Sequence, residues 1–153
     1  MVHPASLTDA EAAAATDIDF RSRMALVAVT GADAHEQIVG VARYSTVLPA
    51  GRHAEVGIVV EDAYQGQGIG SQLLQRLAEY AAEQGLHRLV ATISARNPGV
   101  QALICRSGFP ADYAEAGWGE YQVSVRLKGR PWLYGRALPA GGSIVDALRR
   151  YFR

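Results

Sequence analysis

A glycine-rich segment between an apolar stretch and an amphipathic stretch constrains this chain most strongly. Residues 65–70 read Gln-Gly-Gln-Gly-Ile-Gly and follow the apolar pair Val59-Val60. Apolar residues then recur at helical spacing at Leu73, Leu74, Leu77, Ala78 and Ala81. Glycine lets a backbone come close to a ligand, and the free N–H groups of a first helical turn attract anions. The segment predicts a phosphate or pyrophosphate site between a strand and a helix; a plain tight turn is the alternative.

Two well-known phosphate-binding loops do not fit this segment. The Walker loop requires a lysine after its last glycine, whereas Gly70 is followed by Ser71. The dinucleotide fingerprint requires a third glycine where Ser71 stands, and an acidic residue about 20 positions further on. Neither a nucleoside triphosphate nor a dinucleotide is therefore the expected ligand.

Hydrophobic patterning predicts a mixed sheet with flanking helices. Strands are expected at 24–29, 37–47, 53–60, 87–93 and 120–127, and helices at 7–16, 72–83 and 97–108. The first three strands on short connections indicate an antiparallel meander, and strand 53–60, the following helix and strand 87–93 form a β-α-β unit. The expected fold class is α/β (α+β), with a mixed, mostly antiparallel central sheet.

Length and composition indicate one globular domain without a membrane or metal function. The 153 residues suit a single domain, taken as 1–128, with an arginine- and aromatic-rich tail at 129–153. We expect a short helix of this tail to pack on the domain or on a partner subunit in a homodimer. The lack of a signal peptide or membrane span, the single cysteine and the scattered histidines predict a cytoplasmic protein without a metal. The net charge of zero places nucleic-acid binding last among the function classes.

The loop resembles the Q/R-x-x-G-x-G/A motif of the GCN5-related N-acetyltransferase (GNAT) family through Gln65, Gly68 and Gly70. Asn97, followed by Gly108-Phe109, looks like the second half of the same family pattern. Segments 20–28, 38–44 and 54–60 are similar to the acetyltransferase domain of bacterial Pat-type protein lysine acetyltransferases. The resemblance covers roughly residues 7–127 and implies the GNAT fold. The strand and helix with which such domains begin are expected to be missing here.

The resemblance implies acetyl-CoA as co-substrate and assigns residues to it. In the family, the loop backbone binds the pyrophosphate, a splayed strand end pairs with the pantetheine arm, and an asparagine contacts that arm. In this chain, those roles fall on the loop Gln65, Gly66, Gln67, Gly68, Ile69, Gly70 and Ser71, on the strand end Val59 and Val60, and on Asn97. A plain N-cap is the alternative role for Asn97.

Transfer of acetyl to an amine requires a base, because an ammonium group has no lone pair. Glu55 lies in an otherwise apolar strand, on the same face as His53 and Val59. The resemblance gives Glu55 the role of general base toward a primary amine, either a protein lysine or a small molecule. A solvated surface glutamate is the alternative.

Two residues of the second motif depart from the family or leave its chemistry open. Ile104 stands where many members have a tyrosine that protonates the departing CoA thiolate, and we expect water to be sufficient in its place. Cys105 is expected to be a buried structural cysteine.

A non-catalytic module that senses acyl-CoA is the alternative function. Tyr113, Glu115 and Trp118, within 110–120, are candidate contacts for a cationic acceptor.

Overall fold

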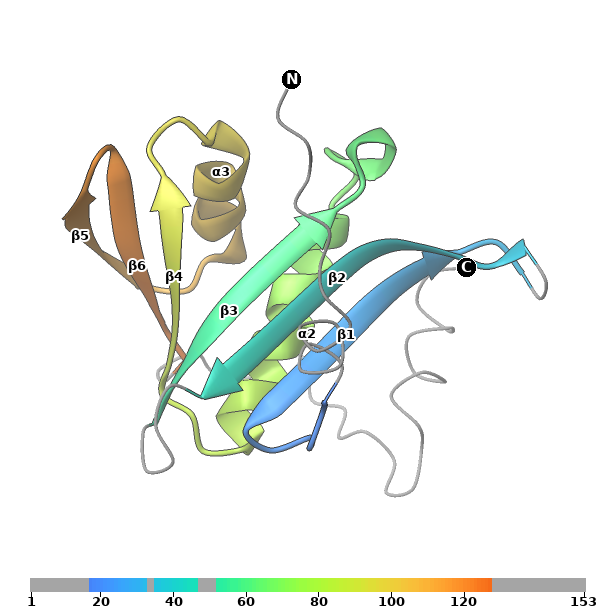
Figure 1. Ribbon diagram of the computed structural model, residues 1–153, viewed down its shortest axis with the longest axis horizontal. Coiled ribbons are helices and arrows are strands. Elements are labelled where there is room, and N and C mark those ends of the chain that lie inside the picture. Colours follow the sequence, from blue (N-terminus) through green and yellow to red (C-terminus); the bar gives the residue numbers. More distant parts are fainter. Residues whose placement is uncertain (1–16, 33–34, 47–51, 128–153) are drawn as a thin grey trace.

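A computed structural model describes residues 17–32, 35–46 and 52–127 of the chain (Figure 1). In chain order the elements are β1 (Arg23–Thr30), β2 (Gln37–Thr46), β3 (His53–Val60), the short helix η2 (Asp62–Tyr64), α2 (Ile69–Glu83), β4 (Arg88–Ser94), α3 (Pro98–Ser107), β5 (Ala111–Gly117) and β6 (Glu120–Arg126). The expected helix 7–16 and the tail 129–153 lie outside the described residues.

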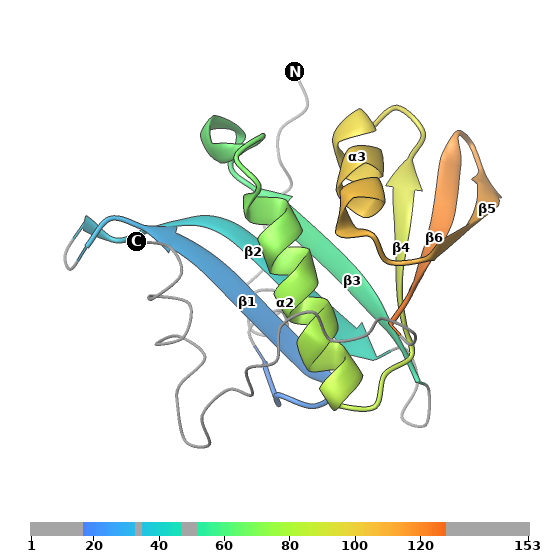
Figure 2. The ribbon, with the colours of Figure 1, turned by 180° about the vertical axis from the view of Figure 1, so that it is seen from behind.

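The six strands form one mixed sheet in the order β1-β2-β3-β4-β6-β5. Only β3 and β4 run parallel, and every other neighbouring pair is antiparallel. Helix α2 crosses one face of β1, β2 and β3, while α3 lies beside β4 (Figure 2). The predicted mixed, mostly antiparallel sheet and its β-α-β unit are confirmed.

Helix α2 begins three residues earlier than predicted, at Ile69 instead of Gln72. Gly68 takes the left-handed conformation at φ +86°, and its carbonyl accepts the first intrahelical bond, from the Gln72 N–H. The sequence pattern did not predict a helix through the glycines before Gln72, because glycine is a poor helix former. The predicted apolar stripe is buried against the sheet, and Gly85 ends the helix at φ +80°.

Helix α3 has the predicted caps but not the predicted burial of its cysteine. The Asn97 side-chain oxygen accepts a bond from the Val100 N–H at 3.2 Å, and Gly108 is left-handed. Ile104 is buried at 6% exposure, whereas Cys105 is exposed. The expectation of a buried Cys105 is wrong, because successive residues of a helix point about 100° apart and only the Ile104 side faces the core.

Strand β5 was not predicted. Its sequence, Ala-Asp-Tyr-Ala-Glu-Ala-Gly, has no β-branched residue and contains three alanines and one glutamate, which favour helices. The strand forms because it pairs with β6 along the sheet edge, with Tyr113 opposite Val123. Tertiary pairing therefore overrides local propensity in this segment.

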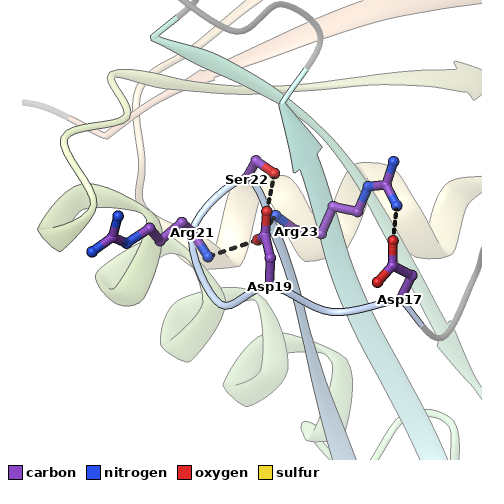
Figure 3. Close-up of polar contacts among 5 residues, drawn as sticks. All are labelled: Asp17, Asp19, Arg21, Ser22 and Arg23. Carbon is purple, nitrogen blue, oxygen red and sulfur yellow. Dashed lines mark hydrogen bonds and ion pairs between the residues drawn. The ribbon is translucent and has the colours of Figure 1, made fainter.

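A tight turn centred on Asp19 leads the chain into β1 (Figure 3). The Asp19 carboxylate accepts the N–H groups of Arg21 at 2.9 Å and Arg23 at 2.8 Å, and also the Ser22 hydroxyl. These bonds, that of Ser22 first, hold the pKa of Asp19 well below its usual range. Phe20 within the turn has a positive φ of 61°.

Two tyrosines attach this turn to the rest of the fold. The Tyr80 hydroxyl of α2 donates to the Phe20 carbonyl at 2.7 Å, and the Tyr44 hydroxyl of β2 donates to the Arg21 carbonyl at 3.2 Å. Burial raises the pKa of Tyr44, and the charges of Tyr80 and Asp19 add to the rise. The start of β1 is thus held against both a helix and a strand.

Candidate active site

Strands β3 and β4 pair only at their first residues and then separate. The parallel pairs are His53 with Arg88, Ala54 with Leu89, and Glu55 with Val90. Beyond this point β3 stays paired with β2 as far as Val60, and β4 stays paired with β6 as far as Ser94. Figure 1 shows the two strands diverging toward their carboxyl ends. The facing edges are left open to an extended ligand that pairs like a strand.

Backbone alternation identifies which groups of β3 face this opening. The Glu61 N–H donates to Val39 of β2 at 2.9 Å, so the backbone groups of Val60 and Ile58 point the opposite way, toward β4. The Val60 carbonyl there accepts a bond from the Gln65 side chain at 3.1 Å. The Val59 side chain is 70% exposed on the outer face. Ile58 was missed from sequence, because its backbone direction depends on the pairing with β2.

The loop after β3 presents backbone N–H groups rather than side chains. Gly66 and Gly68 have positive φ of 75° and 86°, which L side chains rarely adopt. The side chains of Gln65 and Gln67 turn inward and donate to Asp62 at 2.8 Å and to the Ala63 carbonyl at 3.2 Å. Within the described part of the chain, the N–H groups of residues 66–71 have no hydrogen-bond acceptor.

These N–H groups lie at the positive end of the α2 dipole, and the first turn of α2 carries no acidic residue. A phosphate group is the natural ligand of such a helix end. This end of α2 lies next to α3 and the end of β3, since a Cβ at Gly70 would be in ordinary van der Waals contact, at 3.7 Å, with both the Leu103 and Val60 side chains. The structure thus places the start of α2 beside α3 and the end of β3, while the binding roles predicted for residues 65–71 stay predictions.

Glu55 lies on the outer face of the sheet, opposite α2. Exposure alternates along β3, so Ala54 and Val56 face the core while Glu55 and Gly57 face outward. Glu55 pairs with Ser45 on one side and with Val90 on the other. Its carboxylate has no hydrogen bond or ion pair with any residue that the structure describes. The predicted face of Glu55 is confirmed, while its role as base stays a prediction.

The remaining site predictions concern α3 and metal ions. The Asn97 oxygen is used as the helix cap, so a contact with pantetheine would fall to its amide nitrogen. Ile104 is turned into the core and offers no proton donor.

Across residues 17–32, 35–46 and 52–127, no group of His, Cys, Asp and Glu side chains has the arrangement of a metal site. No helix in these same ranges is long and apolar enough to cross a membrane.

Comparison with known proteins identifies the family of this chain. The model of the acetyltransferase (GNAT) family matches residues 3–109. The chain is 32% identical over 93 residues to an acetyltransferase of Pseudomonas aeruginosa, covering 61% of this chain and 50% of that protein. It is 36% identical over 94 residues to the L-methionine sulfoximine/L-methionine sulfone acetyltransferase of the same species, covering 60% and 55%. It therefore spans about half the length of these curated relatives.

A solved structure shows the same arrangement of elements. The GNAT domain of S. lividans PAT superimposes with a TM-score of 0.67 at 26% identity, covering 78% of this chain and 69% of that one. The mixed sheet with its two helices thus matches the fold of a GNAT domain. The chain belongs to the GNAT acetyltransferase family.

Proposed function

We propose that this chain transfers an acetyl group from acetyl-CoA to a primary amine, with Glu55 as the general base. One observation carries the proposal: Glu55 occupies the last parallel pair before β3 and β4 separate. A carboxylate at this position lies at the inner end of the opening, where an extended ligand held by the loop would present its reactive end. Its exposure on the outer face leaves it accessible to an amine.

Acetyl-CoA would be held by backbone groups along its length. The N–H groups of residues 66–71 would bind the pyrophosphate, and Val60 and Ile58 would pair with the pantetheine arm. Because Gln65 bonds to the Val60 carbonyl, its side chain would move or share that acceptor when pantetheine binds. The Ile58 N–H is our candidate for polarising the thioester carbonyl.

In the transfer, the amine nitrogen attacks the carbonyl carbon of the thioester and the carbon–sulfur bond breaks. Glu55 takes the proton that the amine loses, directly or through a water molecule. CoA leaves as a thiolate and takes its proton from water, since Ile104 provides none. An unperturbed thiol has a pKa near ~8.5, so the thiolate is a tolerable leaving group at neutral pH.

The acceptor is proposed only as a primary amine. One relative is named for L-methionine sulfoximine and sulfone, and another, from Escherichia coli, for a ribosomal-protein serine. Because these relatives are named for different acceptors, their names do not indicate whether the acceptor of this chain is a small amine or a protein amine.

A second candidate function is an acyl-CoA-binding module without catalysis. Ile104 favours it, because a buried isoleucine replaces the acid that many family members use.

A screen of amines with acetyl-CoA separates the two functions. Because Cys105 is exposed, we expect it to react with thiol reagents, so the screen should use a Cys105→Ser variant and confirm each acetylated product by mass. Steady CoA release with at least one amine is the expected result. Tight acetyl-CoA binding without release for any amine, including lysine peptides, would support the module instead.

A further inference from the structure

Four arginines of the sheet face outward, and three of them are ion-paired. Arg23 bonds to Asp17 at 2.8 Å, and Arg88 and Arg126 contact Asp112 at 3.0 and 3.5 Å. Arg88 also donates to the Ser124 hydroxyl at 3.1 Å. The fourth is Arg43 in the middle of β2, which has no hydrogen bond or ion pair with the described residues. Arg43 is therefore the outward-facing arginine whose charge is left uncompensated within the described part of the sheet.

Small residues keep the surface around Arg43 open. Arg43 stands opposite Ala25 of β1 and Gly57 of β3 in the register of the sheet. A Cβ added to Gly57 would meet no atom within 4 Å. The backbone at Gly57 has an ordinary strand conformation, so no turn requires a glycine there. What the glycine provides is open space on the outer face, at the position opposite Arg43 and two residues after Glu55.

Glu55 is the carboxylate next to this space. It faces Ser45, two residues along β2 from Arg43, so Glu55 and Arg43 occupy diagonal positions on one face. Diagonal neighbours across an antiparallel pair lie roughly 7–8 Å apart, within reach of long side chains. Nevertheless, no ion pair joins Arg43 to Glu55. The positive charge of Arg43 and the negative charge of Glu55 thus lie on the same face of the sheet, and neither is paired with a described residue. Each group could therefore bind a ligand.

We propose that the acceptor is an α-amino acid or a close analogue, whose carboxylate binds Arg43 while its amino group lies at Glu55. The inference rests on the proposed function and names its acceptor class. An α-amino acid carries its amine and carboxylate on one carbon, which matches two opposite charges on neighbouring positions. The planar guanidinium holds a carboxylate through two parallel bonds, which fixes the direction of the adjacent amine.

The rest of the outer face favours an apolar side chain on that amino acid. Beyond Arg43 and Gly57, the next residues on this face are Val41, Val59 and Val27, which are paired in register across three strands. Val59 is 70% exposed, so this apolar row is available to a ligand. A polyamine would bring a second cation close to Arg43, and a lysine side chain would bring no anion to it. The charge of Arg43 therefore disfavours both as acceptors.

The test compares amines that differ only in the carboxylate. Leucine, methionine and phenylalanine are assayed with acetyl-CoA beside their carboxamides, together with spermidine and a lysine-containing peptide. Amidation lowers the pKa of the adjacent amine and so raises its neutral fraction, which by itself favours the amide. We expect the reverse: kcat/KM for the amino acid exceeds that for its amide by roughly 10- to 100-fold, the effect of one charge-assisted bidentate contact.

Variants of Arg43 assign this preference to the residue. Arg43→Gln is expected to lower kcat/KM for the amino acid roughly 10- to 100-fold while the amide is unchanged, and Arg43→Lys to retain part of the preference. Arg126→Gln, on the same face but paired with Asp112, is the matched control and should leave the preference intact. Unchanged acetyl-CoA affinity and melting temperature show that each variant is folded.

The outcomes distinguish this inference from the proposed function. If amides, spermidine or the peptide react as well as the amino acids, or if Arg43→Gln leaves the preference intact, the amino-acid site is wrong while acetyl transfer stands. If no amine releases CoA although acetyl-CoA binds, the proposed function is wrong and the acceptor assignment falls with it.

Discussion

Glu55 and Val90 form the last pair of the parallel register between β3 and β4, and beyond them the two strands part. This relationship places the candidate base at the inner end of the opening that would hold the acyl chain. On the other side of Glu55 lies Ser45 of β2, so its backbone is held within a continuous sheet. A base on a strand inside a sheet is positioned more rigidly than one on a loop, which favours catalysis by orientation.

The glycine loop can be tested by two substitutions at opposite ends of α2. Gly68→Ala and Gly85→Ala each place a side chain at a positive φ, of 86° and 80°. Each is expected to lower the free energy of unfolding by about 1–2 kcal/mol, the cost of a left-handed L residue. Only Gly68→Ala should also weaken acetyl-CoA binding, by about tenfold or more, because it distorts the N–H groups of the anion site.

Denaturant unfolding and isothermal titration with acetyl-CoA measure the two effects. Gly85→Ala serves as the control for a loss of stability without a change in the loop. Equal acetyl-CoA affinities for the two variants would show that residues 66–71 do not bind the pyrophosphate.

Ile104 and Cys105 are expected to respond differently to truncation although they are adjacent. Ile104→Ala removes a buried side chain and should cost about 2–5 kcal/mol of unfolding free energy. Cys105→Ala removes an exposed one and should change it by no more than about 0.5 kcal/mol. The native Cys105 thiol should also react promptly with a thiol reagent. Slow labelling together with a large loss of stability in Cys105→Ala would contradict the exposed position.

Much of this fold was predictable because its signals are local. The stripe of α2, the Asn97 cap and the glycines at 85 and 108 each act within a few residues of themselves, and all are confirmed. Strand β5 was missed because its formation depends on an edge pairing with β6. The start of α2 was misplaced because Gly68 caps the helix through its backbone rather than through a side chain.

The candidate site shows the same division between local and long-range signals. The glycine loop and the alternation that turns Glu55 outward are readable from neighbouring residues. The separation of β3 from β4 is not, because it depends on how far two strands 35 residues apart stay in register, as Glu55 and Val90 show. The neighbourhood of Arg43 and Glu55 likewise requires the register between β2 and β3.

The turn at Asp19 makes a pH-dependent contribution to stability. Its pKa is lowered in the folded chain, first by the Ser22 hydroxyl and then by the N–H groups of Arg21 and Arg23. A lowered folded pKa stabilises the fold above the unfolded Asp pKa of about 3.9, and this contribution is lost as the pH falls toward the folded value. Asp19→Ala should therefore melt at a lower temperature than wild type at pH 7, and the difference should shrink below about pH 4.

Thermal unfolding of both proteins between neutral and acidic pH measures this effect. Glu83→Ala removes an exposed carboxylate at the end of α2 and should show no comparable pH-dependent difference. A constant difference in melting temperature at every pH would mean that the Asp19 side chain acts by packing and not through its charge.

The central claim, that Glu55 is the base of an acetyl transfer, is tested most directly by Glu55→Gln beside Glu83→Gln. The measurement is kcat with the best amine of the screen and the Kd for acetyl-CoA of the same samples at neutral pH. Glu55→Gln is expected to lower kcat by about 10²- to 10⁴-fold, the usual contribution of a general base, with the Kd unchanged. Glu83→Gln should match the wild type in both quantities. A Glu55→Gln variant that turns over at the wild-type rate would contradict the account.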